Sequence, residues 1–253
     1  MNTYKTSEIA RCIGVHPNTV RLYEELMLIP KPERKANGYR VFKDFHMEQM
    51  KLARTALQIE VLQNGLRKQA ISIIKTSASG DFDKAIYFTK QYLQQIKNEQ
   101  KNAEEAINIT EKLLSGGDPE IDDTVLTRKE AAGYLQITMD ALRNWEMNGL
   151  LTVKRKQNGY RVYKEEDVRR LKIIRSLRCA NYSLSAILRM LNTLSRDPGA
   201  SIRQAIDTPK ENDDIISVCD KLLTSLHYAE KNAQAMLGQL KKMKKQFGTN
   251  PPL

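Results

Sequence analysis

The stretch Arg21-Leu22-Tyr23-Glu24, followed by Asn37-Gly38-Tyr39-Arg40-Val41-Phe42, returns later in the chain as Arg143-Asn144-Trp145-Glu146, followed by Asn158-Gly159-Tyr160-Arg161-Val162-Tyr163. Arg143 follows Arg21 by 122 residues (143 − 21). The two blocks stand one residue closer together in the second copy than in the first. Solenoid repeats have periods of roughly 20–50 residues, so this longer recurrence indicates a duplicated domain. A chain of 253 residues is long enough for two small domains with modest cores.

The composition favours a polyanionic partner. Lys and Arg number 41 against 30 Asp and Glu, which gives a formal charge of +11. Nucleic acid is the commonest partner of so basic a chain, although a basic surface can also serve solubility alone. No apolar run approaches the roughly 20 residues of a membrane span, and the first residues do not resemble a signal peptide. Three distant cysteines favour a reducing compartment, so we expect a cytoplasmic protein without a membrane partner.

Each copy opens with a pattern of helix, tight turn and helix. In the first copy Thr6 is a good N-cap, and Pro17 suits the first turn of the second helix. In the second copy Thr127 and Glu130 have the spacing of a capping box. The first helix of each copy is expected to end near Gly14 or Gln136. This order predicts a helix-turn-helix in both copies.

A small β hairpin, or wing, is predicted after each helix-turn-helix. Asn-Gly between two β-capable runs favours a type I′ turn, in which both central residues have positive φ. Alternation places Val41 inward and Arg40 outward. Helices are then predicted over 44–57 and 165–178, and Ser183 is the expected N-cap of a further helix.

Two later stretches carry apolar or small residues at alternating spacings of three and four. Such a pattern over about four heptads predicts a coiled-coil seam. The expected seam positions are Ile86, Thr89, Leu93, Ile96, Gln100, Ala103, Ile107, Thr110 and Leu114 in the first helix, and Ile215, Cys219, Leu222, Leu226, Ala229, Ala233, Met236, Leu240, Met243 and Phe247 in the second. The stretch 115–119, rich in glycine, is the expected link between the copies.

A winged helix-turn-helix with these two motif blocks, followed by a long heptad helix, resembles the MerR family of bacterial transcription regulators. Members usually hold one such domain per chain and form homodimers through an antiparallel coiled coil, whereas this chain holds two. The resemblance implies a mostly α fold with two winged helix-turn-helix domains, each followed by a long coiled-coil helix, arranged as a pseudo-twofold pair. The expected bounds are 1–75 and 122–195 for the winged domains, and 81–116 and 212–248 for the coiled-coil helices.

The second helix of a helix-turn-helix enters the major groove, and its exposed N-terminal half meets base edges. Residues of a wing reach phosphate and fix position without reading sequence, and the resemblance implies the same for the wing Tyr and Arg. The expected DNA-binding residues are His16, Asn18, Thr19, Arg21, Tyr23, Arg34, Lys35, Tyr39 and Arg40 in the first copy, and Thr138, Arg143, Asn144, Trp145, Lys154, Arg155, Tyr160 and Arg161 in the second.

Several side chains in these blocks have an alternative structural interpretation. Tyr23 and Trp145 could equally cap a small core. Glu24 and Glu146 are expected to pair with an arginine, because phosphate repels carboxylates. Asp140 would also be repelled by phosphate, so the two recognition helices are expected to read different sequences.

Neither a metal site nor a catalytic site is predicted. Cys219 lies on the seam, but no second cysteine or histidine stands at ligand spacing, so a small buried core residue is the favoured role. His46 and His227 are isolated and have no nucleophile or carboxylate partner in the sequence pattern. We therefore expect no enzyme activity and no cofactor, and a small-molecule effector stays unknown.

The function predicted from these features is sequence-specific transcription regulation through double-stranded DNA. The differing copies favour an imperfect palindrome, and the family resemblance implies distortion of the promoter spacer, so that RNA polymerase is engaged indirectly. The coiled coil could pair within one chain or form a homodimer. Two alternatives stay open: a DNA-bending or DNA-anchoring protein of excisionase-like type, and a protein-interaction scaffold.

Overall fold

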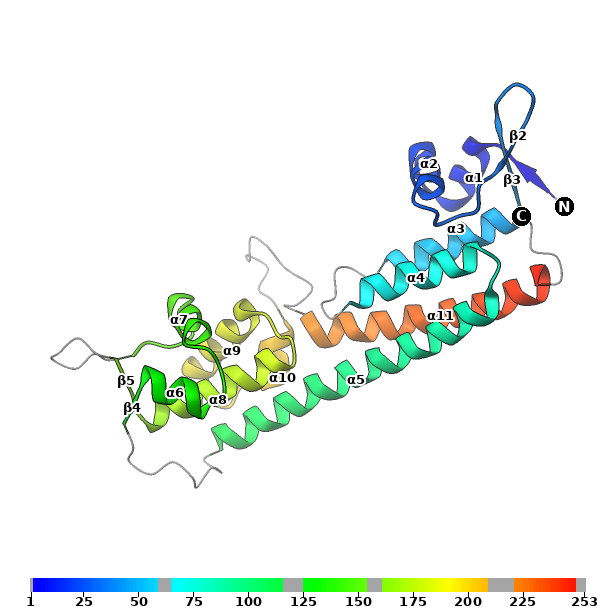
Figure 1. Ribbon diagram of the computed structural model, residues 1–253. Helices are drawn as coiled ribbons and strands as arrows, with labels where there is room; N and C mark the ends of the chain where they lie inside the picture. The colour runs from blue at the N-terminus through cyan, green and yellow to red at the C-terminus, as the bar shows by residue number, and fades with distance from the viewer. Residues whose placement is uncertain (1, 59–64, 116–124, 154–160, 209–220, 249–253) are drawn as a thin grey trace. The chain divides into compact units, whose positions relative to one another are not determined.

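A computed structural model describes residues 2–58, 65–115, 125–153, 161–208 and 221–248, which are mostly helical (Figure 1). The chain divides into two compact units, one formed by Met1–Asn98 with Leu226–Leu253 and the other by Glu99–Ser225. Both boundaries fall inside long helices, α5 (Phe82–Leu114) and α11 (Leu222–Phe247). Each unit therefore combines the winged domain of one copy with a helix segment that belongs to the other copy.

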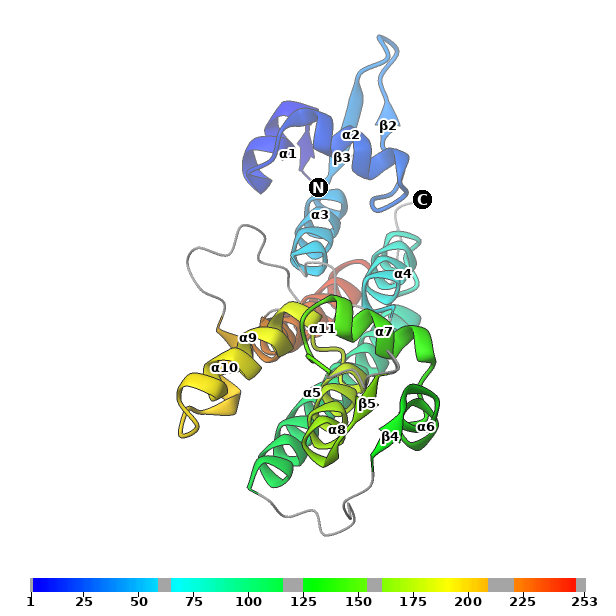
Figure 2. The same cartoon turned by 90° about the vertical axis from the view of Figure 1, so that its left-hand side faces the viewer.

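The first unit begins with the helix-turn-helix and the wing. Its elements are β1 (Thr3–Tyr4), α1 (Thr6–Ile13), α2 (Pro17–Glu25), β2 (Glu33–Arg34), β3 (Arg40–Lys43), α3 (Asp44–Leu57) and α4 (Leu66–Ala78). The three strands form an antiparallel sheet in the order β1-β3-β2, and the β2–β3 hairpin extends beyond α2 (Figure 2). The N-cap of α1 is Lys5 rather than the expected Thr6, because the N–H of Lys5 donates to the Glu8 carboxylate at 2.7 Å.

The hairpin turn differs from the predicted type I′ turn. That type needs positive φ at both central residues, and of Asn37 and Gly38 only Gly38 has one, at 80°. The N–H of Lys35 donates to the carbonyl of Tyr39 at 2.9 Å, and the N–H of Gly38 donates to the carbonyl of Lys35 at 2.8 Å. The loop is thus a three-residue loop that ends on a left-handed glycine, the next commonest solution after two-residue loops.

The inward residue of β3 is Phe42 rather than the predicted Val41. Phe42 is buried and Val41 is half-buried. The equivalent residue in the second copy, Tyr163, is also buried. An aromatic ring therefore joins the wing to the domain core in both copies.

A buried glutamine joins the helices of the first unit. Gln49 in α3 donates through Nε2 to the carbonyls of Leu28 at 3.0 Å and Ile74 at 2.8 Å, and its Oε1 accepts from the Ser77 hydroxyl at 2.8 Å. Buried polar groups are costly unless they are paired, and here the Gln49 amide is paired on both sides. The network fixes α3, α4 and the segment after α2 in one arrangement.

Within the first unit, α11 lies against the first half of α5 (Figure 1). Lys97 pairs with Glu230 at 3.8 Å, and Lys244 pairs with Asp83 at 2.5 Å, so one helix runs opposite to the other. Every predicted seam position of α11 within the described residues is buried, whereas Ile215 and Cys219 lie outside them.

The buried face of α5 is rotated slightly from the predicted seam. Ala85 and Tyr92 are buried, whereas the predicted neighbours Ile86 and Leu93 are half-buried. Leu114, the last predicted position, is exposed. The ring of Tyr92 lies on the buried face of α5, whereas the heptad pattern had predicted the neighbouring Leu93 there.

The second unit repeats the order of the first with a short added helix, α10 (Ile202–Asp207), and the residues that correspond to β2 lie outside the described ones. Its other elements are β4 (Leu126–Thr127), α6 (Arg128–Tyr134), α7 (Met139–Met147), β5 (Val162–Tyr163), α8 (Glu165–Cys179) and α9 (Leu184–Arg196). Strand β4 pairs with β5 as β1 pairs with β3. The predicted capping box of Thr127 with Glu130 and the predicted Ser183 cap are confirmed. The second half of α5 contacts this domain through the Arg203–Glu104 ion pair.

Two backbone positions adopt left-handed φ in both copies. Gly14 has φ 71° and its counterpart Gln136 has φ 52°, while Met27 has φ 57° and its counterpart Gly149 has φ 74°. The duplicated fold thus requires the same turns, but each copy has a glycine at only one of them. Among the helices of the described residues, none is long and apolar enough to cross a membrane.

Candidate nucleic-acid interface

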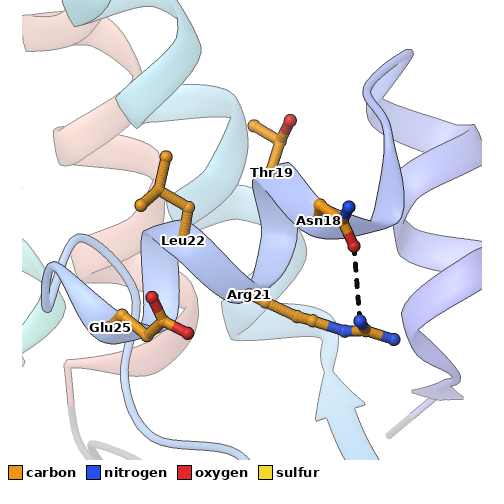
Figure 3. A pocket seen from close by; sticks show the side chains of 5 residues that line it. All are labelled: Asn18, Thr19, Arg21, Leu22 and Glu25. Atoms are coloured by element: carbon orange, nitrogen blue, oxygen red, sulfur yellow. Dashed lines mark hydrogen bonds between the residues drawn. The ribbon is translucent and has the colours of Figure 1, made fainter.

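The second helix of the first copy, α2, exposes a short polar and apolar face. His16 is its N-cap, and the imidazole Nδ1 accepts from the N–H of Asn18 at 3.2 Å. The Asn18 Oδ1 accepts from the Arg21 guanidinium at 3.3 Å (Figure 3). A hollow of about 440 Å³ is lined by Asn18, Thr19, Arg21, Leu22 and Glu25. His16, Asn18 and Arg21 are exposed, as a base-reading surface requires, and Thr19 is half-exposed.

The equivalent helix of the second copy, α7, is built in the same way. Its N-cap is Thr138, whose hydroxyl accepts from the N–H of Ala141 at 3.1 Å. Arg143 and Asn144 are exposed on the same face. The Asn144 Oδ1 accepts from the Asn148 side chain at 2.6 Å. Both copies therefore carry a capped helix with an exposed arginine at the same place.

The aromatic residues of the two helices lie in the domain cores. Tyr23 exposes 8% of its surface and Trp145 exposes 6%. Burial raises the pKa of the Tyr23 hydroxyl, which stays protonated. This burial agrees with the structural interpretation, in which the two rings cap a small core. Tyr23 and Trp145 therefore support the recognition helices, and their prediction as DNA-binding surface residues is corrected.

A glutamate of each recognition helix holds the arginine of the wing. Glu24 accepts from the Arg40 Nε at 2.5 Å and lies 3.9 Å from an Arg34 nitrogen. Glu146 accepts from the Arg161 Nε at 2.9 Å. The predicted pairing of both glutamates with arginine is confirmed. Arg40 and Arg161 thus have a protein partner where the sequence had predicted only phosphate, and this pairing fixes the wing to the recognition helix.

The second copy adds two groups to this cluster. Arg128 donates to Glu146 at 2.6 Å, and the Tyr163 hydroxyl also donates to the Glu146 carboxylate. Burial, together with that hydrogen bond, raises the pKa of Tyr163 to about 12. Tyr163 therefore stays a donor at all physiological pH values. The charge of Glu146 is thus matched by two guanidinium groups and one hydroxyl.

A groove of about 880 Å³ lies between the wing and the helix-turn-helix of the first copy. Arg21 reaches it from α2, and Lys35 and Tyr39 reach it from the hairpin. The groove is also lined by Lys5, before α1, and by Ser7 and Glu8 in the first turn of α1, and sequence reasoning missed them. Helix N-termini and clustered cations both favour an anion, so this groove suits a phosphate backbone.

The remaining predicted site residues divide into two groups. Arg34, Lys35 and Tyr39 are exposed on the hairpin, and Tyr39 exposes 72% of its surface. Lys154, Arg155 and Tyr160 lie outside the described residues, as do Asn158 and Gly159 of the second motif block.

The described residues hold no cluster of three His, Cys, Asp or Glu side chains that could bind a metal ion. Cys12 and Cys179 are free thiols on the surface. Cys219, the residue considered for a metal role, lies outside the described residues. The chemistry gathered at the two recognition helices is that of hydrogen bonding and positive charge.

Comparison with known proteins gives two family matches within the chain. Residues 5–42 match the model of the MerR family regulatory protein, and residues 126–194 match that of the MerR HTH family regulatory protein. These matches fall on the two copies of the duplicated domain. No solved structure matched the chain.

Curated relatives include three proteins named as regulators. The "Probable heavy metal-dependent transcriptional regulator" of Haemophilus influenzae is 33% identical over 115 residues, which are 45% of this chain and 76% of that protein. The "HTH-type transcriptional regulator CueR" of Escherichia coli O6:H1 is 36% identical over 53 residues, 21% of this chain and 39% of CueR. The "Mercuric resistance operon regulatory protein" of Bacillus cereus is 31% identical over 65 residues, 26% of this chain and 49% of that protein. The chain thus spans less than half the length of the last two.

Proposed function

Because the chain belongs to the MerR family of regulatory proteins, we propose that it is a transcriptional regulator that binds double-stranded DNA through both winged domains. The observation that carries the proposal is the groove in which Arg21, Lys35 and Tyr39 converge beside the N-terminus of α1. The exposed end of α2 then meets base edges, and the hairpin meets the adjacent phosphates. In the second domain the same assignment falls on Thr138, Arg143 and Asn144. The place of action is the cytoplasm.

The glutamate–arginine pairs support a fixed distance between the two DNA-contacting elements. Glu24 joins α2 to the wing through Arg40, and Glu146 joins α7 to its wing through Arg161. A preorganised surface loses less side-chain freedom on binding, so more of the contact energy appears as affinity. Arg40 and Arg161 thus position the wing, and Arg34 and Lys35 supply charge to the backbone.

We place the coiled-coil pairing within one chain. The Lys97–Glu230 and Lys244–Asp83 pairs support this, because α5 and α11 come from different copies of the repeat. Two readers in one chain engage two half-sites with a high effective concentration. The resulting pseudo-twofold pair suits an imperfect palindrome, since the two recognition helices differ in sequence.

Distortion of the promoter spacer is the proposed route to RNA polymerase. Bending a DNA site of about 20–30 base pairs costs on the order of a few kcal/mol, and phosphate contacts from both wings offset that cost. The partner in this step is the DNA itself, so the effect on polymerase is indirect.

The test uses full-length protein and fluorescence anisotropy with duplexes recovered by genome-wide binding. The variant Arg21→Ala with Arg143→Ala removes one cation from each recognition helix. The matched control, Lys90→Ala with Lys101→Ala, removes two exposed cations from α5. We expect the first pair to weaken binding about tenfold or more, because each arginine contact is worth roughly 1–3 kcal/mol. If the arginines touch phosphate, the slope of log K against log salt should also flatten by about 0.9 for each.

The outcomes separate the proposal from its alternatives. A weakly specific footprint without promoter-linked sites would favour a DNA-bending or anchoring protein. Unchanged, salt-dependent binding by the double arginine variant would refute the assigned surface. A full-length protein that ignored all duplex DNA at low salt would refute DNA regulation and favour the interaction scaffold.

A further inference from the structure

We infer that the two recognition helices read different half-sites, and that the difference lies at two pairs of equivalent residues, Asn18/Asp140 and Leu22/Asn144. The inference rests on the proposed function and names the bases that each helix prefers. It follows from the exposed faces of α2 and α7, which are built on the same backbone and capped at the same place. Any difference in reading must therefore come from the side chains themselves.

The shared element is the exposed arginine. Arg21 and Arg143 occupy the same position, four residues after the first residue of their helices. A guanidinium donates two parallel hydrogen bonds to the O6 and N7 of guanine, which is the commonest specific contact in the major groove. Both half-sites are therefore expected to have a guanine at the corresponding position.

The first difference is an amide against a carboxylate. Asn18 can both donate and accept, so it suits adenine, and its Oδ1 already accepts from Arg21 at 3.3 Å (Figure 3). Asp140, exposed at the equivalent position, can only accept when ionised and suits the amino group of cytosine. A carboxylate near the backbone is repelled by phosphate whatever the base, so Asp140 lowers the affinity for every site and discriminates only through its hydrogen bond to a base.

The second difference is an apolar stripe against an amide pair. Leu22 exposes 48% of its surface, and Leu26, one turn later, is also exposed. Their counterparts are Asn144 and Asn148, which hydrogen-bond to each other at 2.6 Å. An apolar side chain favours the methyl group of thymine, whereas an asparagine favours adenine. The half-sites should thus differ as thymine against adenine at this position.

The experiment is selection from a random duplex library with the full chain, followed by affinity measurement. The variant Asn18→Asp with Leu22→Asn gives the first helix the two reading residues of the second. We expect its selected site to become more symmetric, and its preference for a symmetric duplex over the wild-type site to rise about tenfold or more. The control Leu114→Asn makes the same chemical change at an exposed leucine of α5, outside both recognition helices, and should leave the selected site unchanged.

A second measurement changes the DNA and compares the affinity of the wild-type protein for two duplexes. Replacing the predicted thymine by uracil removes one methyl group from the DNA, which should weaken wild-type binding about fourfold, the value of one buried methyl. The Leu22→Ala variant should bind both duplexes equally.

These measurements distinguish failure of the inference from failure of the proposed function. A symmetric wild-type site, an unchanged site in the double variant, or insensitivity to uracil would overturn the inference while DNA binding stood. Absence of any duplex binding would overturn both.

Discussion

The sharpest prediction concerns the buried histidine of the helix that follows the first wing. His46 is the third residue of α3 and exposes 4% of its surface. Its Nδ1 accepts from the N–H of Lys43 at 3.0 Å, so the ring is neutral and carries its proton on Nε2. Burial, together with a smaller effect of the positive charge of Lys43, lowers the pKa of His46 from 6.5 to about 4.

The size of the effect follows from that shift. In the unfolded chain the histidine takes up a proton near pH 6.5, whereas the folded protein resists protonation until about pH 4. The folded state is therefore destabilised relative to the unfolded state as the pH falls through this window. The loss approaches about 3 kcal/mol at the lower end, since one pKa unit corresponds to 1.36 kcal/mol. Above pH 6.5 the full stability is retained.

The assay is native-state hydrogen exchange of the α3 amides between pH 4.5 and 7, which reports the opening free energy of this helix. His46→Asn is the control, because its Oδ1 can still accept from the Lys43 N–H but does not titrate. We expect the wild-type free energy to fall relative to that of His46→Asn as the pH is lowered. Two parallel pH profiles would show that His46 does not carry the linkage. Trp145 lies in the other unit, so its fluorescence gives a separate reference.

Four further substitutions test the packing and the backbone. Gln49→Met should lower the free energy of unfolding by about 2–4 kcal/mol in urea, because it leaves buried carbonyls and a hydroxyl unpaired; a neutral result would mean that the network adds nothing. Gly14→Ala should cost roughly 1 kcal/mol, since a Cβ there would meet no atom within 4 Å and only the left-handed backbone resists it. Gln136→Gly should gain a similar amount, and a loss in thermal unfolding would contradict the strain argument. Tyr163→Phe should destabilise the second unit by about 1.5–3 kcal/mol in tryptophan-monitored unfolding, because a charged hydrogen bond is lost; unchanged stability would argue that the arginines suffice for Glu146.

Features set by local spacing were predictable from the sequence. The seam of α11 is buried throughout its described part, because residues at spacings of three and four lie on one face whatever the helix contacts. Ser183 caps α9 for a similar reason, since its hydroxyl needs only the N–H groups of the next turn. The span predicted for the third helix, Asp44–Leu57, also agrees with the structure.

Features set by distant contacts were not predictable. Strands β1 and β4 have only two residues each, too few for an alternation pattern, and they exist because β3 and β5 offer partners. The sequence predicts that Arg40 contacts DNA, because no local pattern shows that its guanidinium pairs with Glu24, 16 residues earlier in the chain. The groove beside Lys5 likewise depends on strand pairing, so its N-terminal wall escaped sequence reasoning.

In the proposed function two DNA-binding domains share one chain, so a substitution can alter the recognition of one half-site alone. In a homodimer one substitution alters both half-sites at once, so the operator stays symmetric. Here Leu22 and Asn144 can change separately, while the ion pairs between α5 and α11 join helices of unlike sequence. The scaffold residues Glu24 and Glu146 keep the same role in both copies, whereas the exposed positions of α2 and α7 differ. Divergence at the exposed reading positions, with the glutamate–arginine pair kept in both copies, is the pattern that an asymmetric operator would favour.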